Sequence, residues 1–223
     1  MKFGVVVFPG SNCDRDMMHA LEMEMNVKVI PLWHKDKDLS MFKSEDCIVL
    51  PGGFSYGDYL RCGAIARFSP MMQSVINFSK EGGKVFGVCN GFQILCESGL
   101  LPGVLLRNAN MQFVCKNIHI TDSNKNSSVA YKIPVAHGEG RYFAQPEILQ
   151  ELEANNQVLY KYCNNEGIIH PDHSPNGSTE NIAGICNKER NVFGMMPHPE
   201  RACSQSLGNT DGRKILASLF SIN

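Results

Sequence analysis

The chain has 223 residues, a formal net charge of -1 at pH 7, 43% hydrophobic residues and 19% charged residues. This length can bury one substantial core, and the composition is that of an ordinary globular protein. A charge so close to zero gives no long-range attraction to nucleic acid or to an anionic membrane, so neither partner is expected. The sequence also contains no apolar stretch long enough to span a bilayer.

The nine cysteines are scattered along the chain, at positions 13, 47, 62, 89, 96, 115, 163, 186 and 203. No two of them form a Cys-x-x-Cys pair, which argues against a zinc ribbon or a dithiol redox centre. The odd total and the size of the chain argue against a secreted disulfide scaffold. Pro9 and Gly10 end the first apolar run too early for a signal segment. We therefore expect a cytoplasmic protein with reduced thiols.

The first half alternates short apolar runs with longer mixed segments. Strands are expected at Phe3–Phe8, Val27–Leu32, Cys47–Leu50 and Lys84–Val88, and helices at Arg15–Met25, Ser69–Lys80 and Asn90–Ser98. The apolar runs are continuous rather than alternating, which is typical of strands buried on both faces. This half therefore predicts a mostly parallel sheet with helices on both sides.

The second half contains closely spaced strand-like segments, at Met111–Thr121, Lys132–Ala136, Gln157–Tyr162, Asn181–Asn187 and Asn191–Met195. Such segments are most easily joined as antiparallel pairs, with Asn187–Asn191 as one hairpin turn. A terminal helix is expected at Asp211–Ile222, and polar loops at Thr121–Ser128 and Cys163–Thr179. We expect one α/β domain over residues 1–223, with a mostly parallel, partly mixed central sheet.

The segment Gly87-Val88-Cys89-Asn90-Gly91 follows a predicted strand and opens a predicted helix. Glycines two residues before and after a nucleophile allow the sharp turn of a nucleophile elbow. The helix N-terminus favours the reactive thiolate, and the Asn90 N–H would point at a developing oxyanion. Most free cysteines are small buried hydrophobes, and the other eight largely fit that description. Cys13 also lies at a possible helix start, but it lacks the trailing glycine and ranks behind Cys89.

A base and a group to orient it are both present in Pro197-His198-Pro199-Glu200-Arg201. Proline disfavours helix at the residue before it, so this segment is expected to be extended. Residues two apart in an extended chain project to the same side. The Glu200 carboxylate would then hold one ring nitrogen of His198 while the other faces Cys89.

Two further segments have weaker signals. Pro51-Gly52-Gly53 follows the third strand, where backbone N–H groups would approach a ligand closely and Gly53 would give a second oxyanion donor; a plain tight turn is the alternative. His170 and His173 have the spacing of metal ligands, but they lie in a Pro/Gly-rich loop without a third ligand. No metal site is expected there.

These motifs resemble those of the class I, triad-type glutamine amidotransferases. Three elements match in order: Pro51-Gly-Gly53, Gly87-Val-Cys-Asn-Gly-Phe-Gln93 and Pro197-His-Pro-Glu200. The acid follows the histidine here, whereas it precedes the histidine in α/β-hydrolases. The resemblance implies a flavodoxin-like three-layer sandwich and catalysis through a glutamyl thioester. It assigns Cys89, His198 and Glu200 to the triad, Gly53 and Asn90 to the oxyanion hole, and Gln93, His137 and Gly138 to the glutamine amino-acid end.

Longer matches resemble one family in this class, the glutaminase subunits of phosphoribosylformylglycinamidine synthases. They include the segments Phe8–Asp14, Pro51–Gly63, Asn90–Gln93, Pro134–Tyr142 and Pro197–Arg201. This resemblance implies delivery of ammonia from glutamine to a large synthetase subunit in purine synthesis. It also implies ATP and Mg on that partner, no cofactor in this chain, and a small bridging subunit.

Several points stay open. The stretch Arg107–Phe113 departs from the family pattern and leaves Asn108 and Asn110 as alternative substrate contacts. An amidotransferase subunit of another synthetase and a stand-alone γ-glutamyl hydrolase are the alternative enzymes. A regulatory subunit with a retired site is the non-catalytic alternative, and the complete Cys-His-Glu set argues against it.

Overall fold

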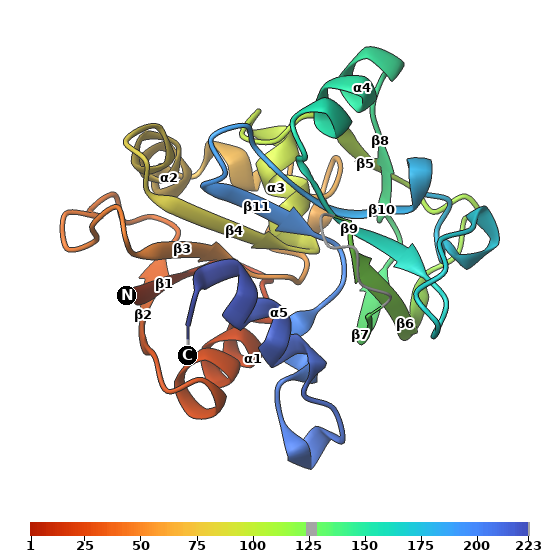
Figure 1. Ribbon diagram of the computed structural model, residues 1–223. Helices are drawn as coiled ribbons and strands as arrows, with labels where there is room; N and C mark the ends of the chain where they lie inside the picture. The colour runs from red at the N-terminus through yellow and green to blue at the C-terminus, as the bar shows by residue number, and fades with distance from the viewer. Residues whose placement is uncertain (124–128, 223) are drawn as a thin grey trace.

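The computed structural model describes residues 1–123 and 129–222, and Figure 1 shows its helices and strands. The strands are β1 Lys2–Val7, β2 Lys28–Trp33, β3 Cys47–Leu50, β4 Lys84–Val88, β5 Val104–Leu106, β6 Val114–Asp122, β7 Ala130–His137, β8 Arg141–Phe143, β9 Val158–Cys163, β10 Ile182–Cys186 and β11 Val192–Met195. The helices are α1 Asp14–His19, which continues as π-helix over Ala20–Glu24, α2 Pro70–Lys80, α3 Asn90–Glu97, α4 Pro146–Ala154 and α5 Asp211–Phe220. Single 3₁₀ turns lie at Ser55–Asp58, Ala66–Phe68, Pro171–His173, Thr179–Asn181, Pro199–Ala202 and Gln205–Leu207.

A mixed sheet forms the centre of the molecule. Among the described residues it has nine strands in the order β2-β1-β3-β4-β11-β10-β9-β6-β7. The first five of these strands are parallel to one another, and the pairs from β11 to β7 are antiparallel. The prediction of an α/β fold with a mostly parallel, partly mixed sheet is confirmed.

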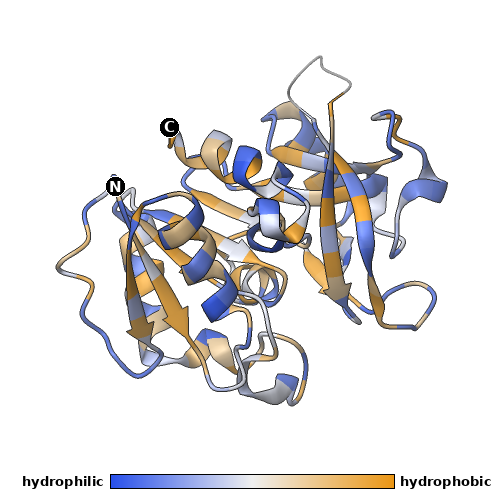
Figure 2. Cartoon of the chain, turned by 90° about the horizontal axis from the view of Figure 1, so that it is seen from below, coloured by the Kyte–Doolittle hydropathy of each residue, from blue (hydrophilic) through white to orange (hydrophobic). Residues whose placement is uncertain are grey.

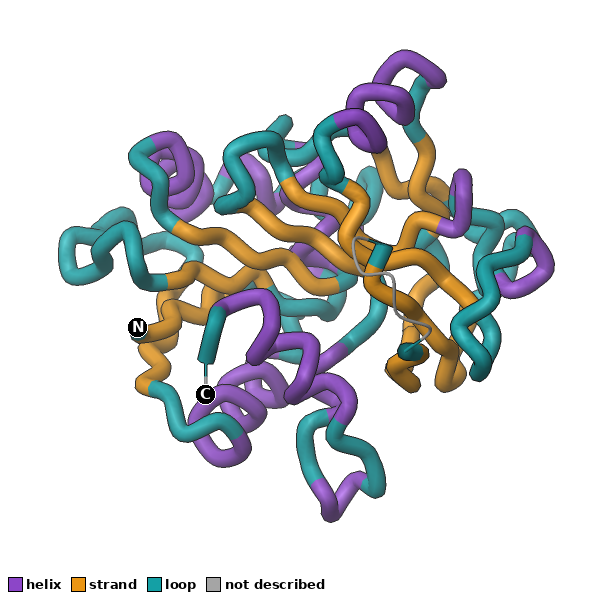
Figure 3. The backbone as a smooth tube through the Cα atoms, viewed as in Figure 1, coloured by secondary structure: helices purple, strands orange, loops and turns teal. Residues whose placement is uncertain are grey.

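Helices cover both faces of the parallel part, which gives three layers. α2 and α3 pack on one face, and α1 and α5 lie on the other (Figures 1 and 3). At α5, the Phe220 ring contacts the rings of Phe3 and Phe86 edge to face, with centroids 5.1 and 5.4 Å apart. Every residue of β3 is buried, as a strand covered on both sides requires.

In the antiparallel part, β9 and β10 are buried almost throughout, whereas the outermost strand β7 is partly accessible. Buried and accessible residues alternate along much of β7, and Figure 2 shows hydrophobic and hydrophilic residues alternating along two long strands there. Its hairpin between β10 and β11 turns at Asn187–Asn191 as predicted, with the Asn187 N–H donating to Val192 O at 3.0 Å. This hairpin brings β11 back beside β4 in the middle of the sheet.

The sequence did not predict α4 or the two-stranded sheet of β5 and β8. The polar loop expected at Thr121–Ser128 begins later than predicted, because β6 runs to Asp122. Residues 124–128 of that loop lie outside the described residues. Within the described residues, no helix combines the length and apolarity needed to cross a membrane.

Candidate active site

Cys89 occupies the sharp turn between β4 and α3. Its φ and ψ are 50° and -104°, a strained combination for a residue with a side chain. The turn is possible because glycines flank it. A Cβ on Gly91 would overlap the backbone oxygen of Leu50, and a Cβ on Gly87 would lie 2.6 Å from the Gly91 backbone. The strand, the helix and both glycines thus stand where a nucleophile elbow needs them.

We expect Gly91→Ala to lower the free energy of unfolding by about 3 kcal/mol or more, because the new methyl group meets backbone that cannot swing aside. Gly82→Ala is the control: its φ is also positive at 88°, but nothing lies within 4 Å of its added Cβ. The left-handed backbone alone should cost that variant about 1–2 kcal/mol. Urea unfolding monitored by circular dichroism measures both changes, and equal losses would contradict the packing explanation.

His198 and Glu200 lie after β11, and the prediction of an extended segment is wrong here, because a 3₁₀ turn at Pro199–Ala202 contains Glu200. The His198 N–H donates to Pro134 O at 2.9 Å, which ties the segment to β7. Nδ1 of His198 lies 2.6 Å from Oε1 of Glu200, and both side chains are buried. Burial alone would lower the pKa of His198, but the Glu200 carboxylate and the Cys89 sulfur together outweigh it and raise the pKa to about 10.

The other ring nitrogen of His198 remains available for proton transfer. Within the described part of the chain, Nε2 is buried and has no close, well-aligned hydrogen-bond partner. The Cys89 sulfur acts on the ring through its charge and as a weak hydrogen-bond partner, and its thiol also makes a long contact to Ala136 O, at 3.7 Å. The raised pKa favours a protonated ring, so His198 can keep the proton that it takes from Cys89 through Nε2 while Glu200 holds Nδ1.

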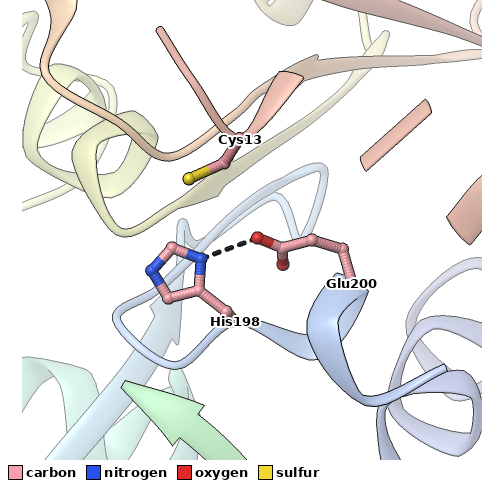
Figure 4. A group of neighbouring side chains, drawn as sticks. All are labelled: Cys13, His198 and Glu200. Atoms are coloured by element: carbon pink, nitrogen blue, oxygen red, sulfur yellow. Dashed lines mark hydrogen bonds and ion pairs between the residues drawn. The ribbon is translucent and has the colours of Figure 1, made fainter. Parts of the chain in front are cut away.

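Cys13, which ranks behind Cys89 as the predicted nucleophile, lies next to His198. Its sulfur, one ring nitrogen of His198 and one oxygen of Glu200 lie within 4.8 Å of one another, and Figure 4 shows the sulfur pointing toward the ring. Burial, and then the charge of Glu200, raise the pKa of the Cys13 thiol to about 12, although Arg201 opposes them. Cys13 therefore stays a protonated thiol at neutral pH, unlike a nucleophile.

A pocket of about 250 Å³ opens beside Cys89. Its lining includes every predicted substrate residue and one predicted oxyanion donor, namely Gln93, His137, Gly138 and Gly53. It also includes charged residues that sequence reasoning missed, namely Asp58, Arg107 and Glu139. All three stand in stretches already noted, Pro51–Gly63, Arg107–Phe113 and Pro134–Tyr142, but no pattern in the sequence assigned these three residues a role.

Asn90 and Gln93 are held by a shared network. The Asn90 side chain donates to Asp58 at 3.1 Å and to Gln93 at 2.9 Å, and it accepts from the Ser55 N–H at 3.1 Å. Gln93 in turn donates to the backbone oxygen of Glu139 at 2.6 Å. The amide of Gln93 thus shapes the pocket wall, and the network fixes the first turn of α3 against the loop after β3.

The His137 side chain is uncharged and forms part of the wall of the same pocket. Burial, helped by the charge on His198, lowers the pKa of His137 to about 4. Its Nδ1 lies 3.1 Å from Oδ1 of Asn108, whose amide nitrogen donates to backbone oxygens. Nδ1 therefore carries the hydrogen, and Nε2 is an acceptor without a partner among the described residues.

The sequence leaves Asn108 and Asn110 as alternative substrate contacts, and Asn108 has a structural role. It is fully buried and also accepts from the Gly140 N–H at 3.1 Å, whereas Asn110 is exposed. Asn108 therefore builds the pocket wall through His137 rather than lining the cavity. At the distant loop, His170 pairs with Asp172 and His173 with Ile168 O, but the described residues there do not bring three ligand atoms within 4.8 Å of one another.

A family model for the CobB/CobQ-like glutamine amidotransferase domain matches residues 1–215. The chain belongs to this glutamine amidotransferase family. This amidotransferase is 52% identical over 227 residues to phosphoribosylformylglycinamidine synthase subunit PurQ of Moorella thermoacetica, covering 98% of this chain and 95% of that protein. It is 53% identical over 220 residues to the subunit of the same name in Acaryochloris marina, covering 95% and 92%.

Solved structures agree with this amidotransferase fold. A chain in the structure of PurLQS from Thermotoga maritima matches with a TM-score of 0.84 and 38% identity, covering 99% of this chain and 97% of that one. A glutamine amidotransferase from Thermotoga maritima matches with a TM-score of 0.56 at 14% identity, covering 100% of this chain and 86% of that one. At that identity, the second match supports the fold alone.

Proposed function

We propose that this chain is the glutaminase subunit of a phosphoribosylformylglycinamidine synthase, and that residues 1–223 act as one domain. The observation that carries the proposal is a buried base-and-acid pair, His198 and Glu200, behind a strained cysteine that faces a pocket. The assignment to this synthase is supported by the two PurQ relatives, which are 52% and 53% identical over nearly the whole length of the chain.

The proposed reaction begins with proton transfer from the Cys89 thiol to Nε2 of His198. The thiolate attacks the carboxamide carbon of glutamine, and the backbone N–H groups of Gly53 and Asn90 receive the negative charge on oxygen. His198 then returns the proton to the leaving nitrogen, so that ammonia departs and a glutamyl thioester remains. Water hydrolyses the thioester with His198 again as the base, which releases glutamate and restores the thiol.

The pocket wall would hold the amino-acid end of glutamine. Gln93 and Gly138 line it, and the bare Nε2 of neutral His137 can accept a hydrogen bond from a substrate donor. Water is limited at the reacting atoms because Cys89 is only 5% exposed.

The chain is a subunit of a multisubunit complex, as the relatives' names indicate. We infer that a large synthetase subunit uses ATP and Mg to accept the ammonia, that a small subunit bridges the two, and that this chain needs no cofactor of its own. We place the complex in the cytoplasm.

The test is labelling by a chloroketone analogue of glutamine, followed by peptide mass mapping. Cys89 should be alkylated first, because it lines the pocket next to His198, and excess glutamine should slow the reaction. Cys13 is the internal control: it lies in the same site, but its thiol is kept protonated. First labelling at Cys13 would overturn the assignment of the nucleophile.

A further inference from the structure

The loop between β1 and α1 has no role in the reaction described so far, yet it contacts both parts of the active site. Its backbone oxygens at Pro9 and Gly10 accept from the N–H groups of Tyr56 and Phe54, at 2.6 and 3.1 Å. These bonds attach the loop to the segment that follows Gly53. The loop and the proposed oxyanion donor are therefore held as one unit.

The side chain of Cys13 ends this loop against the catalytic histidine. Gly52 lies on the other side of the contact: a Cβ there would be 2.7 Å from Cε1 of His198 and 3.2 Å from the Cys13 sulfur. The His198 ring is thus confined by a bare glycine backbone and by a thiol that is 3% exposed. This confinement limits rotation of the His198 ring out of its hydrogen bond with Glu200.

Arg201 links this contact to α1. Its Nη2 donates to the Cys13 sulfur at 3.0 Å, and its Nε donates to the Asp16 carboxylate at 3.0 Å. Arg201 also directly follows Glu200 in the turn Pro199–Ala202, so the contacts of Arg201 anchor the backbone segment that carries the carboxylate orienting His198. The sulfur, the guanidinium and Asp16 form a chain of contacts from α1 to the catalytic pair.

We propose that Cys13 and Arg201 are positioning residues that hold the His198 ring in register with Cys89. The inference rests on the glutaminase function proposed above. A metal ion is a poorer explanation of the cluster of Cys13, His198 and Glu200. Its donors are already bonded to one another or to Arg201, and that cation lies against the sulfur.

The experiment compares Cys13→Ala, Cys13→Ser and Arg201→Met in the complete complex, with Cys47→Ala as the control. Cys47 is a fully buried free thiol at the far end of β3, so its variant makes the same deletion away from the site. We expect Cys13→Ala and Arg201→Met to lower kcat for glutamine hydrolysis by about 10- to 100-fold, because small misplacements of a catalytic group have effects of that size. KM should stay within about twofold, since neither residue lines the pocket.

Cys13→Ser should recover most of the rate, because its hydroxyl can still accept from Arg201. A second readout is the pH dependence of Cys89 alkylation by the glutamine analogue. In Cys13→Ala the half-maximal rate should move to higher pH, because a loosely held His198 no longer supports the thiolate, and Cys47→Ala should leave it unchanged. A merely structural role would not move this midpoint.

Rates of Cys13→Ala and Arg201→Met equal to that of Cys47→Ala would overturn the positioning proposal. An equal loss in Cys13→Ser and Cys13→Ala would overturn the role of the Arg201 contact. Should Cys13→Ala fail to fold, Cys13→Ser and Arg201→Met still decide the question. Failure of the proposed function is distinguishable, because it would appear as a wild-type chain that neither hydrolyses glutamine in the complex nor reacts at Cys89.

Discussion

Cys89→Ala should abolish glutamine-dependent synthesis by the complex, lowering it at least about 10⁴-fold, the scale on which loss of a covalent nucleophile acts. Synthesis from added ammonium should stay within about twofold of wild type, since ammonia then bypasses this subunit. The cause is chemical rather than structural. The methyl group of alanine fits the space of the thiol at the turn, but it cannot form the thioester. Product formation from each nitrogen source, measured on the same complex, gives both values.

Cys47→Ala is the matched control for this experiment, because it removes a buried thiol from the opposite end of the sheet. It should leave both activities near wild type. If Cys89→Ala removed synthesis from ammonium as well as synthesis from glutamine, the proposal that this subunit only supplies ammonia would be wrong. If the free chain turned glutamine over rapidly without any partner, a stand-alone γ-glutamyl hydrolase would be the better description.

Glu200→Gln should lower kcat/KM for glutamine by about 10³- to 10⁴-fold, the range seen when the acid of a catalytic triad becomes an amide. The pKa of His198 is raised because the Glu200 carboxylate opposes the effect of burial. With a neutral amide in place of the carboxylate, only the Cys89 sulfur still opposes the effect of burial, and the pKa of His198 falls. His198 then loses its proton at lower pH, and the basic limb of the pH–rate profile should shift downward. Steady-state rates across pH 5–10 measure this.

Glu24→Gln makes the same chemical change in another ion pair, 2.7 Å from Arg213 and remote from the pocket. It should leave the rate and the profile unchanged. Glu200→Asp keeps the charge but shortens the side chain, so it should recover part of the rate. A full rate in Glu200→Gln would show that the carboxylate does not orient His198.

The elbow and the base were predictable because their signals are local. Gly87 and Gly91 flank the nucleophile at a fixed spacing, and the structure explains both by backbone that approaches within contact distance. The prolines around His198 predict an extended segment, whereas the structure has a 3₁₀ turn at Pro199–Ala202, so the pairing of base and acid was predictable but the backbone that makes it was not. These patterns depend on neighbours along the chain, and one sequence is sufficient to read them.

Other features depend on contacts between distant segments. Nothing near Cys13 in the sequence indicates that it meets His198 and Arg201, because that contact exists only after β1 and β11 join the same sheet. Asp58 and Glu139 reach the pocket from separate loops for the same reason. The strands β5 and β8 have three residues each, too few for an alternation of hydrophobic and polar residues to be visible in the sequence. The helix α4 buries only Leu152, so its amphipathic pattern is weak.

The late position of β11 affects how the protein is made. It is the last strand of the sheet in the chain, but it lies between β4 and β10 near the centre. During synthesis on the ribosome, Cys89 emerges long before His198 and Glu200, and a gap stays open beside β4 until the final hairpin arrives. A nascent or truncated chain would therefore hold the nucleophile without its base. Ammonia release can begin only when the final hairpin and the segment after it are in place.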